Sequence, residues 1–113
     1  MTRKKIAHGD RMDAIRATLL RLAREGRTIF YGELGQAVGI PARGPWKPVL
    51  DEIARLETAE GRPDITFLVI NKQTGLPGQI GFKPAKPPTP GQRRIADAEI
   101  QKVYGYYRAK NDA

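Results

Sequence analysis

The segment YGELGQAVGIPARGPWKPVLDEI, from Tyr31 to Ile53, predicts two helices separated by a turn. The first helix is short, opening at Gly32 and closing at Gly39, because glycine readily adopts the conformations that end a helix. Its side chains predicted to face inward are Leu34, Ala37 and Val38. A short helix followed by a Gly/Pro turn and a longer helix is typical of a helix-turn-helix, but it also occurs in helical proteins that bind no nucleic acid.

The prolines indicate where the turn lies and where the longer helix begins. The run GIPARGP contains Pro41, Gly44 and Pro45, which interrupt a helix on both sides. The next helix is predicted to begin near 45–47, since proline is tolerated in a first turn, where the amides have no partner within the helix. Its predicted buried side chains are Val49, Leu50, Ile53 and Leu56.

The flanking segments predict a small α/β core. Apolar side chains at helical spacing predict a helix from about 10 to 26, and RTIFY (27–31) predicts a brief strand. The apolar run at 65–70 predicts a buried strand. NKQTGLPG then predicts a turn and QIGF (79–82) a short returning strand, so that the two strands form a hairpin.

The remaining segments are an arm, a spacer and a last helix. Residues 1–9 predict a basic flexible arm, and the proline-rich stretch 83–92 an extended spacer. Residues 93–113 predict a C-terminal helix. Residues 10–82 then have the element order of a winged helix-turn-helix domain, an α+β fold with a three-helix core and a β-hairpin wing.

Composition favours a polyanionic partner. The chain has 113 residues, no cysteine and a formal net charge of +8, and its isoelectric point is about 10.1. An excess of that size attracts nucleic acid by counterion release. The alternative is a basic surface that only keeps the protein soluble. We expect a cytoplasmic protein, because the chain contains no apolar run of membrane-spanning length and no signal peptide.

The expected contacts are with duplex DNA, through its backbone phosphates. They lie at the start of the longer helix, at the tip of the wing and in the arm: Arg43, Lys47, Asn71, Lys72, Arg3, Lys4 and Lys5. Such contacts position a protein without encoding sequence. The rest of the longer helix is acidic, and its carboxylates are predicted to form a solvated face paired with Arg55: Asp51, Glu52, Glu57 and Glu60.

A second hypothesis is a protein-interaction or homodimerisation module. Here the winged helix is only a scaffold, and the aromatic C-terminal helix packs on a partner. Its tyrosines are Tyr104, Tyr106 and Tyr107. The acidic longer helix favours this alternative, because carboxylates repel phosphate.

The sequence also resembles a known family. TIFYGELGQAVGIP (28–41) is similar to the Thr-x-x-Tyr-Gly-x-Leu-Ala…Gly-x-Pro pattern in the DNA-binding domain of alkylguanine-DNA alkyltransferases and alkyltransferase-like proteins. The matching positions are Thr28, Tyr31, Gly32, Leu34, Gly39 and Pro41. The resemblance covers about 28–82 and implies a winged helix in which Lys47 stands where the family has a base-displacing arginine.

The departure from this family concerns its chemistry. The reactive Pro-Cys-His-Arg motif would fall near 66–69, where the chain reads TFLV, so no thiolate can accept an alkyl group. The only histidine, His8, lies in the arm without a partner for catalysis. We therefore expect a protein that is not an enzyme and that uses neither a cofactor nor a metal ion.

Overall fold

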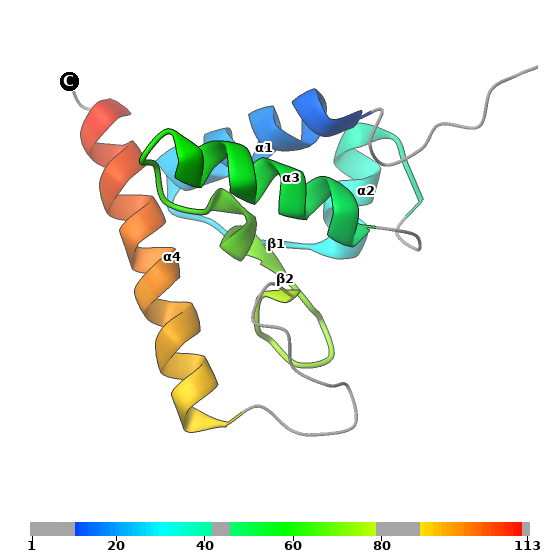
Figure 1. Ribbon diagram of the computed structural model, residues 1–113. Helices are drawn as coiled ribbons and strands as arrows, with labels where there is room; N and C mark the ends of the chain where they lie inside the picture. Colours follow the sequence, from blue (N-terminus) through cyan, green and yellow to red (C-terminus); the bar gives the residue numbers. More distant parts are fainter. Residues whose placement is uncertain (1–10, 42–45, 79–88, 112–113) are drawn as a thin grey trace, which may run out of the picture.

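The computed structural model describes residues 11–41, 46–78 and 89–111 (Figure 1). In chain order the elements are α1 (Met12–Glu25), β1 (Ile29–Phe30), α2 (Tyr31–Val38), α3 (Trp46–Ala59), the 3-10 helix η2 (Ile65–Leu68), β2 (Val69–Ile70) and α4 (Pro90–Asn111). The described part is thus mostly helical, with 4 α-helices around a two-stranded parallel sheet.

The first three helices form where the apolar spacing predicts them. In α1 the buried side chains include Ile15, Leu19 and Leu22, and Gly26 ends the helix with a left-handed φ of 72°. In α3 the buried apolar side chains are Trp46, Val49, Leu50 and Ile53. In α2 Leu34 and Val38 are buried as predicted.

The expectation for Ala37 is wrong. This side chain is exposed, and Gly35 is buried in its place. The inward face of α2, which packs against α1, β1 and β2, therefore passes through Leu34, Gly35 and Val38.

The predicted strand at 65–70 is only partly correct. Residues 65–68 form the 3-10 helix η2, and only Val69 and Ile70 are extended. The Asp64 side chain caps η2 by accepting hydrogen bonds from the Thr66 amide (2.9 Å) and the Thr66 hydroxyl. Because η2 packs against α1, α3 and α4, its side chains are buried on several sides, and a buried run does not distinguish a strand from a helical turn.

The two strands pair in parallel, with Ile29 opposite Val69 and Phe30 opposite Ile70. After β2 the chain turns through 71–76 and passes Ile70 again, where Pro77 forms a single antiparallel bridge. The predicted turn is therefore present, but the described residues show no hairpin wing. The predicted returning strand, 79–82, lies outside them.

The last helix begins at Pro90, earlier than the predicted start at 93. Thr89 and Gln92 form a reciprocal cap: the Gln92 amide donates to Thr89 Oγ1 (3.1 Å) and the Thr89 amide to Gln92 Oε1 (2.9 Å). Proline directly after the cap is favourable because its missing N–H would have no partner there. Figure 1 shows α4 along one side of the body, where it packs against α1 and η2. Its buried side chains are Ala96, Val103 and Tyr107.

Candidate nucleic-acid interface

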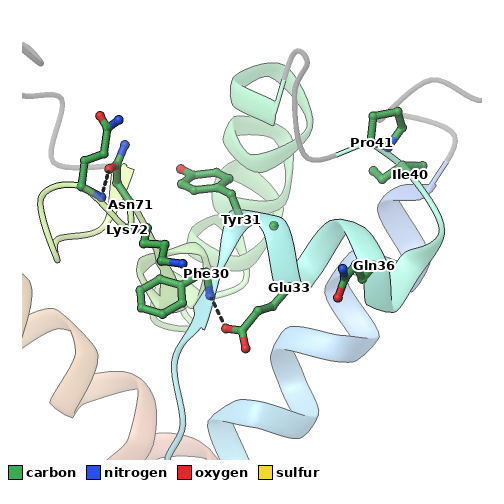
Figure 2. Close-up of a pocket in the computed structure, with 10 residues that line it drawn as sticks. Phe30, Tyr31, Glu33, Gln36, Ile40, Pro41, Asn71 and Lys72 are labelled. Atoms are coloured by element: carbon green, nitrogen blue, oxygen red, sulfur yellow. Dashed lines mark hydrogen bonds between the residues drawn. The ribbon is translucent and has the colours of Figure 1, made fainter.

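A cleft of about 810 Å³ lies between the start of α2 and the turn that follows β2 (Figure 2). The parallel strand pairing creates it, because the register that places Phe30 beside Ile70 also brings the residues after each strand together. The lining residues are Phe30, Tyr31, Gly32, Glu33, Gln36, Ile40, Pro41, Asn71, Lys72 and Gln73. The cleft therefore combines an aromatic and aliphatic wall with amide side chains, one carboxylate and one ammonium group.

Tyr31 connects this cleft to the start of α3. Its ring packs edge-on against Trp46, with ring centroids 5.8 Å apart. Its hydroxyl lies close to Gly78: a methyl group there would approach the Tyr31 oxygen to 2.1 Å. Burial, and then the charge of Asp51, raise the pKa of Tyr31 above its ordinary value, so the hydroxyl stays protonated at neutral pH.

At the N-terminal end of α2, a side chain of the protein accepts a hydrogen bond from a backbone amide. Glu33 Oε1 accepts a hydrogen bond from the Phe30 amide at 3.1 Å. A carboxylate in the first turn also interacts favourably with the helix dipole. Glu33 therefore already neutralises the positive end of this helix. Among the residues that line the cleft, the positively charged side chain is Lys72.

Two of the predicted contact residues, Asn71 and Lys72, lie together at this cleft. The Asn71 side chain holds the turn, because its Oδ1 accepts from the amides of Gln73 (2.8 Å) and Thr74 (3.3 Å). Lys72 is exposed and forms no ion pair with any residue that the structure describes. Asn71 thus shapes the turn that presents Lys72, whose charge is available to a ligand.

Lys47 lies apart from the lining of the cleft. Its side chain is 81 % exposed on the first turn of α3, and its ammonium group pairs with Asp51 at 2.9 Å. Further along α3, Arg55 pairs with Glu52, as the sequence predicts. Both cations on the exposed face of α3 are therefore matched by carboxylates. The other predicted contacts, Arg3, Lys4, Lys5 and Arg43, lie outside the described residues.

The expectation that Glu57 lies on a solvated face is wrong. Glu57 is 0 % exposed, at the end of α3 where α1, α3 and α4 meet. Its carboxylate accepts hydrogen bonds from Arg16 Nε (2.5 Å), Arg62 Nε (2.5 Å) and the Tyr107 hydroxyl (3.0 Å). Burial acts to raise the pKa of Glu57, but the hydrogen bonds from Arg62, Arg16 and Tyr107 together lower it below the ordinary value.

This Glu57 cluster (Glu57, Arg16, Arg62 and Tyr107) was not predicted from the sequence. Helical spacing placed Glu57 next to other carboxylates, which indicated solvent. The available signal was its position: Glu57 follows Leu50 and Ile53 at spacings of seven and four residues, so it continues the apolar stripe of α3.

The segment where the reactive motif of the alkyltransferases would fall, 66–69, is part of the core. Thr66, Leu68 and Val69 are each 0 % exposed. Core packing is thus what these residues do in this fold. Over the described residues, no group of three or more His, Cys, Asp or Glu side chains is placed to hold a metal ion.

None of the helices in the described ranges is both long enough and apolar enough to cross a membrane. Comparison of the chain with models of known protein families, with curated proteins and with solved structures found no match.

Proposed function

We propose that this chain is a non-catalytic nucleic-acid-binding domain that contacts duplex DNA through its backbone phosphates. The observation that carries this proposal is Lys72, a cation with no ion-pair partner among the described residues, at the rim of the 810 Å³ cleft. A net charge of +8 supplies the long-range attraction for a polyanion. Lys72 supplies a defined point of contact.

The finer fold proposal is a winged helix-turn-helix. In it, α2 and α3 are the helical pair and the chain from β2 onward is the wing, whose tip is the turn carrying Asn71 and Lys72. The start of α3 lies near this turn, since Trp46 packs on Tyr31 and Tyr31 lines the cleft. Lys47 would then add a phosphate contact, weakened by its pairing with Asp51.

We also propose kinship with alkyltransferase-like proteins, on the pattern at 28–41. Such a relative has no alkyl-acceptor chemistry, because the chain has no cysteine and the corresponding segment, 66–69, carries buried core residues. We propose neither a cofactor nor a metal ion for it.

The test is the binding of a mixed-sequence duplex over a range of salt concentrations. Each phosphate contact contributes about 0.9 to the slope of log affinity against log salt, or about eightfold in affinity near 0.1 M salt. We expect Lys72→Gln to lose about that much. The matched control is Lys102→Gln, which removes the same charge from an exposed lysine of α4 that is already paired with Glu99 at 2.9 Å. Equal losses for the two variants would show that only net charge matters and would refute the site.

A homodimerisation or protein-interaction module is the second candidate. One observation favours it: the large apolar side chain of Ile95 on α4 is 58 % exposed, so it could contact a partner. Deleting α4 cannot test this, because its buried side chains belong to the core. Sedimentation of wild type against Ile95→Gln is the suitable experiment. A shift from dimer to monomer in the variant, with no duplex binding by either protein, would favour this alternative.

A further inference from the structure

Arginine side chains gather around the last turn of α1. The nearest Arg21 and Arg27 guanidinium nitrogens lie 3.8 Å and 3.6 Å from the carboxylate oxygens of Glu25. Arg24 lies in the same turn, is exposed, and forms no ion pair within the described part of the chain. Glu25 is therefore the carboxylate shared by this turn, and its single charge is divided between two arginines.

A fourth arginine comes from α4. A Cβ atom built on Gly26 would lie 3.6 Å from Arg108 Nη1, so the Arg108 guanidinium rests directly beside the end of α1. The α4 backbone is held here by the neighbouring Tyr107, which is 5 % exposed and bonded to Glu57. Figure 1 shows the C-terminal ends of α1 and α4 side by side at this end of the molecule.

The charges in this arginine cluster (Arg21, Arg24, Arg27 and Arg108) do not cancel. Arg21 and Arg27 share the one carboxylate of Glu25, and Arg24 and Arg108 add two further guanidinium groups, so these five side chains carry a net charge of +3. The helix C-terminus contributes a partial charge of only about −0.5, and one cation in the last turn is enough to complement it. Stabilisation of α1 therefore explains one arginine and leaves the others unexplained.

We infer that the arginine cluster is a second phosphate-contacting surface for the nucleic acid. The inference rests on the proposed function, because it takes duplex DNA as the partner. Guanidinium groups bind phosphate with two parallel hydrogen bonds and are less strongly hydrated than ammonium groups. β1 joins Arg27 to Tyr31, and an extended chain of four residues spans at most about 14 Å. The backbone of Arg27 thus lies within about 14 Å of that of Tyr31, which lines the Lys72 cleft, and we assign both surfaces to one duplex.

The test compares two double variants that remove the same charge. Arg24→Gln with Arg108→Gln disrupts the cluster. Arg93→Gln with Arg94→Gln removes two exposed arginines from the other end of α4, about 20 Å away at 1.5 Å per residue. Near 0.1 M salt, we expect the cluster variant to lose about 60-fold in duplex affinity and about two units of salt slope. The control variant loses much less, and Arg24→Lys with Arg108→Lys keeps most of the affinity.

The outcomes separate this inference from the proposed function. If wild type binds duplex DNA and both glutamine variants lose the same affinity, the cluster is not a contact surface, although the proposed function survives. If wild type shows no salt-dependent duplex binding at all, the proposed function fails and takes the inference with it. Binding to vesicles of anionic lipid instead of DNA, abolished only in the cluster variant, would also overturn the inference, because the partner would then be a membrane surface.

Discussion

Replacing Glu57 by glutamine should be the most destabilising conservative change in this domain. The substitution keeps the shape of the side chain but removes the charge that holds Arg16, Arg62 and the Tyr107 hydroxyl together. Two cations are then left beside a neutral amide at a position with 0 % exposure. Such a change differs from losing a surface ion pair, because the remaining charges are already partly desolvated.

The magnitude follows from how buried the partners are. Breaking a fully buried ion pair costs about 3–5 kcal/mol. The side chains of Arg16 and Arg62 are 37 % and 27 % exposed, so water can partly solvate the charges left behind and the lower end applies. We expect a loss of about 3 kcal/mol, against a total of roughly 6–17 kcal/mol for a domain of this length. At about 4 °C per kcal/mol, Tm should fall by about 12 °C.

Urea denaturation followed by circular dichroism at neutral pH measures this loss. The control is Glu60→Gln, an exposed carboxylate near the same end of α3, which should change the free energy of unfolding by less than about 0.5 kcal/mol. The pH dependence gives a second readout. Because the folded-state pKa of Glu57 is lowered, its stabilising contribution is present above its unfolded value of 4.5 and is lost as pH falls further. If Glu57→Gln unfolds at the same urea concentration as wild type, the Glu57 cluster does not stabilise the fold.

Two further predictions concern tyrosines. Gly78→Ala should destabilise the fold by about 1–3 kcal/mol, because the new methyl group would lie 2.1 Å from the Tyr31 hydroxyl and that ring packs against Trp46. Urea denaturation measures this loss. The control is Gly105→Ala, whose methyl group would have no atom within 4 Å and which should be neutral or stabilising. Burial, followed by the charge of Glu57, raises the pKa of Tyr107 from 10.0 to about 12, so the unfolding free energy should fall as pH rises from 10 to 12. Tyr107→Phe should show a smaller fall over that interval, and an identical pH profile would contradict the assignment.

Local patterns predicted the helices because each signal acts within a few residues. The apolar stripes of α1 and α3 and the glycines at 26 and 39 are such signals, and the Thr89–Gln92 cap is a further local signal for the start of α4. The strand at 65–70 failed for the opposite reason. Whether a buried run is extended or helical depends on what surrounds it, and η2 packs against α1, α3 and α4, two of which, α1 and α4, are distant from it in sequence.

The candidate sites also differ in whether they depend on local sequence or on contacts between distant segments. Placing Lys72 at an exposed turn needed only the glycine and polar residues around it, and the structure agrees. The cleft beside it required the parallel pairing of segments 40 residues apart, 29–30 with 69–70. Glu57 was assigned to solvent because two of its partners, Arg16 and Tyr107, are 41 and 50 residues away. In the arginine cluster, likewise, Arg21, Arg24 and Arg27 are neighbours in the sequence, but Arg108 joins them only because α4 returns to the end of α1.

The packing of α4 also has a consequence for how the domain is made in the cell. Val103 and Tyr107 fill the core beneath helices that are synthesised much earlier, so a nascent chain emerging from a ribosome cannot complete its core until these residues have left the exit tunnel. Until then α1 and η2 lack their contacts with α4, and Glu57 lacks its hydroxyl partner. The core is therefore completed only after Tyr107 has emerged, and nascent chains arrested before that point should be sensitive to proteases and bound by chaperones.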